Sequence, residues 1–225
     1  MPSQKPKVGA ERGKKLHNLA EQFLSTKPTS ELETFEDFLL AHDLWEHDLR
    51  HGLRSANTNP ELVELRNLAH DPNSQVDILV EQGFTLTPVY LGYIDLIVLD
   101  RRSGELKVTI HDHKFMSNKR SVMTPDEARK DYQTLIYAKS LIGHFRIESI
   151  GFSFDYYGTK YKWKEKLNFQ LTAQEINDSW STVLSDTHKV LNNYLIESGR
   201  KTTPNYLSCG MYGGCEYKHI CFGES

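Results

Sequence analysis

Asp95, Asp112 and Lys114 are the residues of this sequence whose types and spacing point most directly to chemistry. Asp95 closes the segment Gly92-Tyr93-Ile94-Asp95, and the other two lie in Ile110-His111-Asp112-His113-Lys114. Two carboxylates on neighbouring strands can hold one hard cation such as Mg²⁺ through their oxygens. A lysine beside a metal-bound carboxylate pair suits the hydrolysis of a phosphodiester. The alternative is an ordinary salt bridge at a strand end.

The segments that carry these residues are predicted to be the two strands of a hairpin. Gly92–Leu99 and Leu106–Ile110 are rich in branched and apolar residues, and Asp100–Gly104 between them has the composition of a turn. Side chains alternate along a strand, so Asp112 and Lys114 continue the apolar face of the second strand. Charges on a buried face are costly unless they are paired or bind a metal.

The position of the turn predicts which residues face one another. A hairpin folded about Arg102 and Ser103 would place Asp95 opposite Ile110 and diagonal to Asp112. Diagonal neighbours across two strands are about 7–8 Å apart, close enough for two carboxylates to share a cation.

Composition and charge limit the kind of protein. The chain has 225 residues, 38% of them hydrophobic and 25% charged, which fits one globular domain with a sizeable core. Its net charge of -3 excludes a generally basic surface, so any contact with nucleic acid needs a local groove or bound cations. Residues 1–15 contain no apolar signal core, and no run has the length of a membrane span. We therefore expect a cytosolic protein that has no membrane partner.

The order of the predicted elements is helices, then strands, then one further helix, strands and a last helix. Helical stretches are expected at residues 10–24, 30–41, 44–55 and 60–70. Strands are expected over residues 75–114, the first two being 76–80 and 84–90. Thr124, Pro125 and Glu127 have the order of a capping box and begin a helix that should reach about Ile142. A second hairpin, residues 148–157 and 161–171, precedes a long helix at 173–198.

This order predicts an α/β (α+β) domain with a central mixed β-sheet flanked by helices. We divide the single domain, residues 1–225, into three parts. The N-terminal helical part covers about 10–70, the catalytic core about 75–171, and the C-terminal helix with its cysteine-bearing tail about 173–225.

Four short motifs lie in order on these expected elements. They are Gly13/His17/Glu21, Gly92–Asp95, Asp112–Lys114 and Gln133/Tyr137. Each motif is common by itself, but in this order the set resembles the RecB-like branch of the PD-(D/E)XK nuclease superfamily. That branch includes bacterial and phage exonucleases and the CRISPR-associated adaptation exonucleases. The resemblance implies a restriction-endonuclease-like core.

The resemblance also implies roles for individual residues. His17, Asp95, Asp112 and the backbone carbonyl of His113 would hold Mg²⁺ or Mn²⁺, and the imidazole shifts the preference somewhat towards Mn²⁺. Lys114 would position the attacking water and stabilise the charged phosphate, so Lys114, Asp95 and Asp112 form the catalytic set.

Further residues are assigned supporting roles. Glu81 on the upstream strand, with Gln133 and Tyr137 on one helical face, would support the active site. Lys119 and Arg120 follow Lys114 in a basic loop and are expected to bind DNA. Asp77 and His111 are expected to be structural.

The C-terminal tail carries all three cysteines of the chain, Cys209, Cys215 and Cys221. Several RecB-like nucleases hold an iron–sulfur cluster with four cysteines, and the final spacing here resembles theirs. The middle spacing is longer, and no upstream cysteine exists to supply a fourth thiolate. Three readings stay open: an iron–sulfur cluster, a Zn²⁺ site completed by His219, or a tail that binds nothing.

The expected function is that of a metal-dependent DNA nuclease. An exonuclease that acts on DNA ends or single strands fits best, in phage or bacterial recombination, replication or repair and beside partner proteins of those processes. The alternatives are a catalytically inactive DNA-binding or scaffolding member of the same fold, and a structure-specific endonuclease. The expected setting is the cytoplasm of a bacterial or phage-infected cell.

Overall fold

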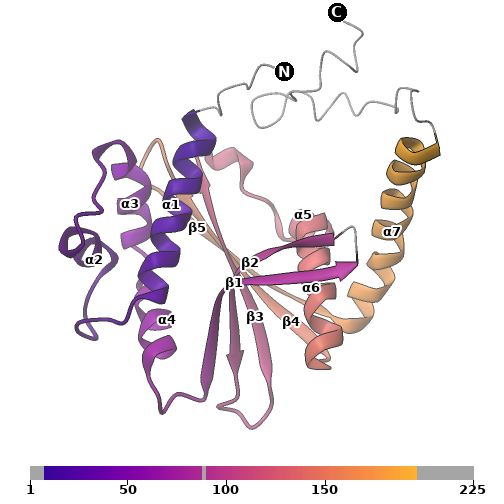
Figure 1. The fold of residues 1–225 in the computed structure, drawn as a ribbon, viewed down its shortest axis with the longest axis horizontal. Helices are drawn as coiled ribbons and strands as arrows, with labels where there is room; N and C mark the ends of the chain where they lie inside the picture. The colour runs from indigo at the N-terminus through magenta and orange to yellow at the C-terminus, as the bar shows by residue number, and fades with distance from the viewer. Residues whose placement is uncertain (1–7, 88–89, 197–225) are drawn as a thin grey trace, which may run out of the picture.

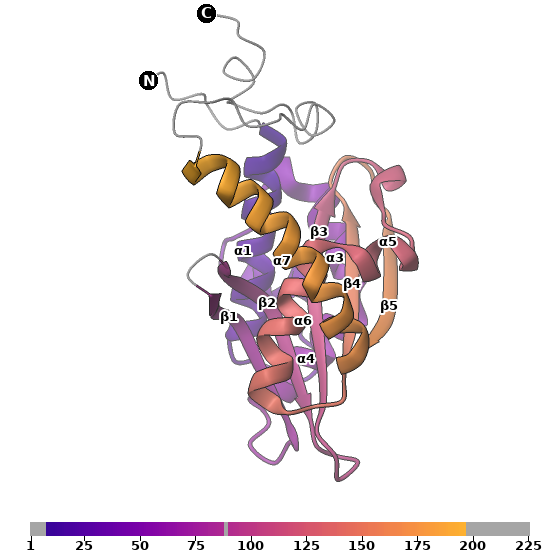
Figure 2. The same cartoon turned by 90° about the vertical axis from the view of Figure 1, so that its right-hand side faces the viewer.

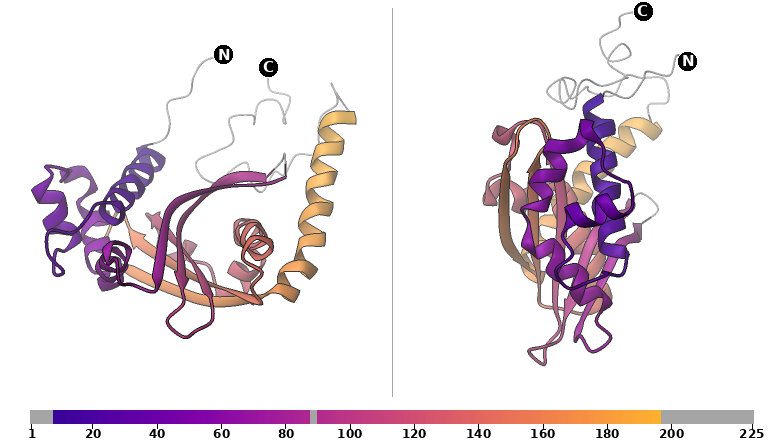
Figure 3. Two further views of the ribbon diagram at one scale, coloured as in Figure 1. Left: turned by 60° about the horizontal axis from the view of Figure 1, so that its bottom comes forward. Right: turned by 90° about the vertical axis from the view of Figure 1, so that its left-hand side faces the viewer.

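A five-stranded sheet separates two layers of helices in the computed structural model, which describes residues 8–87 and 90–196 (Figure 1). The strands are β1 (Val76–Thr87), β2 (Tyr90–Asp100), β3 (Lys107–Met116), β4 (Ser149–Gly158) and β5 (Lys164–Thr172). One layer contains α1 (Val8–Ser25), α2 (Phe35–Ala41), α3 (Arg50–Asn57) and α4 (Pro60–His70). The other layer contains α5 (Pro125–Lys130), α6 (Tyr132–Phe145) and α7 (Ala173–Ile196), as Figures 2 and 3 show from the side.

The sheet is mixed and its strand order is β1-β2-β3-β4-β5. Strands β3 and β4 are parallel, and the other neighbouring pairs are antiparallel. A parallel pair needs a long crossover connection, which α5 and α6 supply here. The predicted class, a mixed sheet flanked by helices, is confirmed.

Each face of the sheet has its own apolar core. Phe152, Phe154 and Phe169 are buried with residues of α6 and α7. On the opposite face, Phe23 and Phe38 are buried with residues of α1 to α4. Both faces of the central strands are therefore covered, and any charged side chain on them must find a partner inside the protein.

The register of the β2–β3 hairpin differs from the predicted one. Ile110 pairs with Ile97 instead of facing Asp95, and the paired register ends at Leu96 and His111. The turn is longer than assumed: the Gly104 amide donates to the Arg101 carbonyl, and the glycine has φ +84. β3 begins only at Lys107. Asp95 directly precedes Leu96 on β2, and Asp112 directly follows His111 on β3. The two aspartates are therefore closer to being opposite each other than the predicted register implied.

Three further boundaries differ from prediction, each for a local reason. The predicted strands 76–80 and 84–90 are one strand, β1, which continues through Glu81. The predicted helix from Thr124 to Ile142 is divided at Asp131, whose side chain accepts a hydrogen bond from the Thr134 amide and caps α6. The predicted helices 30–41 and 44–55 begin later, at Phe35 and Arg50. Thr34 and Asp37 form a capping box for the first, and a short 3₁₀ helix, η1 (His47–Leu49), precedes the second.

The remaining elements agree with prediction within a few residues. The capping box of Thr124 and Glu127 is present, and the β4–β5 hairpin and α7 occupy the predicted positions. Within the described ranges, no helix is long and apolar enough to cross a membrane. The predicted ligands Cys209, Cys215, His219 and Cys221 lie outside the described residues.

Candidate active site

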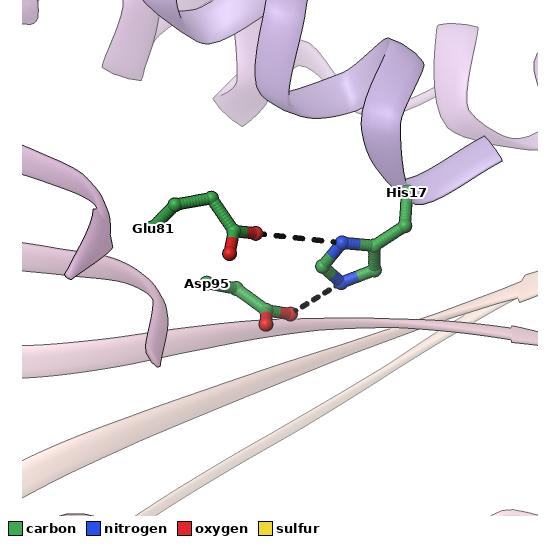
Figure 4. A group of neighbouring side chains, drawn as sticks. All are labelled: His17, Glu81 and Asp95. Carbon is green, nitrogen blue, oxygen red and sulfur yellow. Dashed lines mark hydrogen bonds and ion pairs between the residues drawn. The ribbon is translucent and has the colours of Figure 1, made fainter. Parts of the chain in front are cut away.

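His17 stands where α1 passes over the sheet. Leu16 and Ala20 are buried on the apolar side of α1 and fix the helix, and His17 projects beside them. Its Nε2 lies 2.7 Å from Oδ2 of Asp95, and its Nδ1 lies 3.6 Å from Oε1 of Glu81 (Figure 4). The imidazole is thus held between carboxylates from two strands.

Glu81 reaches this group because of an unusual backbone. It lies between the pairs Val80–Leu96 and Gln82–Ile94, which places it beside Asp95 on the neighbouring strand. Its φ is +48, in the left-handed region that a residue with a side chain seldom adopts inside a strand. Such conformations carry a cost and collect at functional sites. One ligand atom each of His17, Glu81 and Asp95 lies within 4.8 Å of the others.

Asp95 connects this group to β3. Its Oδ2 also accepts a hydrogen bond of 3.0 Å from the backbone amide of His113. Burial is the largest effect and would raise the pKa of Asp95, but the hydrogen bond and charge of His17 together with the His113 amide outweigh it, and the pKa is lowered. That same hydrogen bond raises the pKa of His17. Burial, together with the charge of Asp95, raises the pKa of Glu81. The group therefore concentrates negative charge beside one imidazole.

Asp112 and Lys114 form a second group on the face of β3 that α6 covers. Lys114 Nζ lies 2.6 Å from Oδ2 of Asp112 and donates to Oε1 of Gln133 at 3.0 Å. The Gln133 amide donates in turn to Oδ1 of Asp112 at 3.2 Å and to the Tyr137 hydroxyl at 2.8 Å. The Tyr137 hydroxyl donates to the Tyr93 carbonyl at 2.8 Å. The network is closed by hydrogen bonds except at Oδ2 of Asp112, whose contact is the ion pair with Lys114.

Burial dominates the electrostatics of the second group. It raises the pKa of Asp112 despite the neighbouring Lys114 ammonium, and the charge of Asp95 adds to the increase. Burial also raises the pKa of Tyr137 to about 12, so this hydroxyl stays protonated. The effect of Asp95 on Asp112 means that the two carboxylates act on each other across the two groups.

Comparison with known proteins identifies the family. A family model described as PD-(D/E)XK nuclease superfamily matches residues 2–222. The chain belongs to that superfamily. One solved structure, titled "Crystal structure of SSO0001", is 14% identical with a TM-score of 0.29, and the match covers 82% of this chain and 92% of that one. No protein of curated function matches the sequence.

The donor set of the site agrees with the divalent metals that PD-(D/E)XK nucleases use. The group of His17, Glu81 and Asp95 offers one imidazole nitrogen and carboxylate oxygens within 4.8 Å of one another. Carboxylates suit Mg²⁺ and Mn²⁺, and an imidazole suits Mn²⁺ better than Mg²⁺. A hollow of about 440 Å³ opens onto this group and gives solvent access to it.

In the structure, the predicted site residues form two adjoining groups. His17, Glu81 and Asp95 are mutual neighbours, whereas Asp112 is held by Lys114 and Gln133. Glu81, predicted only as support, is as close to the cluster as the residues predicted to be ligands.

The other predicted residues lie around these groups. The Tyr137 hydroxyl is engaged inside the protein, because it donates to the Tyr93 carbonyl, and the residue lies beside the second group. The basic loop contains a 3₁₀ helix, η2 (Lys119–Ser121), on which Arg120 is exposed and Lys119 forms an ion pair with Glu165. Asp77, predicted to be structural, pairs with Arg101 at the surface.

Lys14 and Asn18 were missed by the sequence reasoning. Both line the hollow beside His17. They lie three residues before and one residue after His17 on α1, so helical spacing about that histidine was the signal that could have found Lys14.

Proposed function

We propose that this protein is a metal-dependent DNA nuclease, with an exonuclease in recombination, replication or repair as its most specific form. The observation that carries the proposal is that β3 connects two groups of polar side chains. His17, Glu81 and Asp95 form one group and Asp112 with Lys114 forms the other, and the backbone amide of His113, next to Asp112 in the sequence, is bonded to Asp95. The exonuclease class rests on the RecB-like order of the motifs.

His17, Glu81, Asp95 and Asp112, with the His113 carbonyl, are the residues that would hold Mg²⁺ or Mn²⁺. When bound, the cation would polarise a water molecule and offset charge on the phosphate. His17 is already oriented by two carboxylates, and Asp95 by the His113 amide, so little rearrangement of these side chains is needed.

Lys114 acts on the phosphate and on the water. Asp112 and Gln133 hold its ammonium from two directions, which fixes a positive charge in a partly buried place. A preorganised charge of this kind stabilises the negative charge that develops during phosphoryl transfer. Gln133 also contacts Asp112, so its role is to position Asp112 and Lys114 rather than to contact the substrate.

Cleavage of labelled DNA tests the proposal. Single-stranded and double-stranded DNA, linear with one labelled end or covalently closed, is incubated with Mg²⁺, Mn²⁺ or chelator. We expect metal-dependent digestion of linear DNA that starts at an end and leaves closed circles intact. Cleavage of closed circles would favour the structure-specific endonuclease instead. DNA binding without cleavage in either metal would favour the inactive DNA-binding member of the fold.

The variant Lys114→Ala tests the assigned chemistry. Loss of one preorganised charge at a phosphoryl centre should lower turnover by at least about a hundredfold. The matched control is Lys107→Ala on the same strand, because this lysine is exposed at the first residue of β3, far from the site. That variant should cleave at the wild-type rate. Full activity of Lys114→Ala would contradict the role of Lys114, and equal melting temperatures of the two variants would exclude misfolding.

A further inference from the structure

A second set of polar side chains lies on the opposite face of β3 from Asp112. His111 and His113 alternate with Asp112 along the strand, and their register partners on β4 are Ser153 and Asp155. All four are buried, between the sheet and the layer of α1 to α4. Buried polar side chains in such a position ordinarily find hydrogen-bond partners.

These side chains instead keep several atoms without a partner. His111 is 4% exposed and Asp155 is 1% exposed. Among the described residues, Nδ1 of His111 and both carboxylate oxygens of Asp155 have no hydrogen-bond partner. A buried carboxylate without hydrogen bonds costs several kcal/mol unless a cation compensates it. Lys164 Nζ lies 4.0 Å from Oδ1 of Asp155, so its charge is partly offset, but no donor reaches hydrogen-bond distance of either oxygen in the described part of the chain.

Glu61 completes a cluster with these two residues. One ligand atom each of Glu61, His111 and Asp155 lies within 4.8 Å of the others. Ligand atoms about 2.1 Å from a common zinc ion are at most about 4.2 Å apart, so a small contraction would complete the arrangement. The three residues come from α4, β3 and β4, which are three separate elements.

We propose that Glu61, His111 and Asp155 form a second metal site, for a divalent transition ion of the Zn²⁺ class, which fastens α4 to the sheet. One imidazole and two carboxylates are ligand types that Zn²⁺ accepts, with water in the fourth position. A hollow of about 500 Å³ lined by Glu61, His111 and Lys166 gives the ion a path from solvent.

Two lysines of β5 are the competing explanation for the cluster. Lys166 forms an ion pair with Glu61, and Lys164 donates to Oδ1 of Asn59 at 2.6 Å. Lys164 Nζ comes no nearer than 4.0 Å to Asp155. The lysines thus bind Glu61 and Asn59, and their charges lower the pKa of Asp155, but neither donates a hydrogen bond to it. The Lys166 ammonium is on a flexible stem and can move to solvent when an ion binds.

Zinc binding by the full chain tests the proposal once the other candidate sites are removed. In the test background the three cysteines of the tail are changed to serine and Asp95→Asn weakens the candidate active site. Equilibrium dialysis with Zn²⁺ alone, followed by elemental analysis, should find one equivalent per chain. Adding Asp155→Asn should remove that equivalent, and Glu61→Gln should weaken affinity at least tenfold.

A neighbouring residue supplies the matched control. Glu64→Gln makes the same charge change one turn further along α4, at an exposed position, and should leave zinc affinity unchanged. Circular dichroism and melting in chelator establish that each variant is folded. Because Glu61 is partly exposed, Glu61→Gln keeps the test informative even if Asp155→Asn does not fold.

Lys166→Gln separates the two explanations of the cluster. If an ion displaces the ammonium, removing it should tighten zinc binding about tenfold. In crystals soaked with Zn²⁺, the anomalous signal should lie between Glu61, His111 and Asp155. A background protein without bound zinc, an undiminished equivalent in Asp155→Asn, or a zinc peak only at His17 would each overturn the proposal. The nuclease proposal would be unaffected by any of these results.

Discussion

The two faces of the sheet at β3 and β4 both carry buried polar side chains, but these differ in how they are hydrogen-bonded. On the α6 face, Asp112 and Lys114 belong to a network in which Gln133 connects both to Tyr137. On the opposite face, His111 of β3 and Asp155 of β4 keep buried atoms that have no hydrogen bond to any described residue. Both sets are within the sheet, so burial alone does not explain the difference.

The difference shows what each set needs from outside the protein. A network whose members satisfy one another can hold its geometry in advance of a ligand, which is what a catalytic charge requires. A buried carboxylate without a partner lowers stability until something binds to it. The first face is therefore suited to act on a substrate, and the second to gain stability from an ion.

The buried pair of Arg66 and Glu33 shows that this chain can satisfy charges in its N-terminal core. Arg66 is 1% exposed, lies 3.1 Å from Glu33 and donates to the carbonyl of Thr26. Its guanidinium also lies 4.3 Å from the centre of the Phe23 ring. Because the same helical layer supports a fully paired arginine, the unpartnered atoms near Asp155 stand out as a local feature.

A variant that breaks the hydrogen-bond network on the α6 face should have the largest effect on stability and turnover. Gln133→Leu removes the bonds to Asp112, Lys114 and Tyr137 and leaves buried polar groups unsatisfied. We expect a destabilisation on the order of 3 kcal/mol and a loss of nuclease turnover of about a hundredfold. Chemical denaturation and single-turnover cleavage measure the two effects.

The control for this variant is Gln174→Leu. Gln174 is an exposed residue on α7 that bonds only to Asp178 one turn away, among the contacts of the described residues. Its replacement should change stability by less than about 0.5 kcal/mol. If Gln133→Leu were as stable and active as this control, the network would have no role in holding Lys114.

Removing the charge of Asp155, on the opposite face of the sheet, should have a smaller effect on stability, and it should be a gain rather than a loss. Burial raises the pKa of Asp155 to about 6, above its ordinary value of 3.8. Ionisation of this group therefore disfavours folding by about 3 kcal/mol at most above that pH. In chelator, Asp155→Asn should stabilise the protein by about 1–2 kcal/mol at pH 8, because the buried amide itself stays incompletely paired.

The sign of the pH dependence follows from the direction of that shift. The folded carboxyl holds its proton up to about pH 6 and the unfolded one only to about 3.8. The wild type therefore loses this part of its stability as pH rises through 6, and the advantage of the variant should shrink towards pH 4. Denaturation at pH 5 and pH 8 measures it, with Asp77→Asn at the surface as control. An advantage that grows on acidification would contradict the unpaired state of Asp155.

The strands and their motifs could be predicted because local patterns specify them. The alternation of β3, the capping box at Thr124 and the helical spacing about His17 are all contained in short segments. The register of the hairpin could not, since the length of its turn depends on how Gly104 and the residues around it fold. The division of the helix at Asp131 was also missed, because a capping aspartate resembles an ordinary helical residue in sequence.

The grouping of the polar residues required the folded structure. Glu61, His111 and Asp155 are separated by 50 and 44 residues, and His111 by itself has the character of a buried strand residue. Only the packing of the helical layer that contains α4 on this side of the sheet brings them together. The role of Glu81 also depended on a backbone conformation that its sequence does not announce.

The distinction between paired and unpaired charges extends to the basic loop after β3 and gives the smallest predicted effect. Lys119 is paired with Glu165, whereas Arg120 is exposed on η2. If the loop contacts the phosphate backbone, Arg120→Ala should weaken DNA binding about threefold and reduce the salt slope by about one. Lys119→Ala should have less effect because Glu165 already offsets its charge, and Lys107→Ala at the far end of β3 should have none.

Binding is measured by fluorescence anisotropy at several salt concentrations with chelator present, on DNA of unrelated sequences. The loss should be similar for all of them, since phosphate contacts carry no base information. If Lys119→Ala were the more damaging variant, the ion pair with Glu165 would have to open on binding. If neither variant changed the salt slope, the loop would lie outside the DNA path.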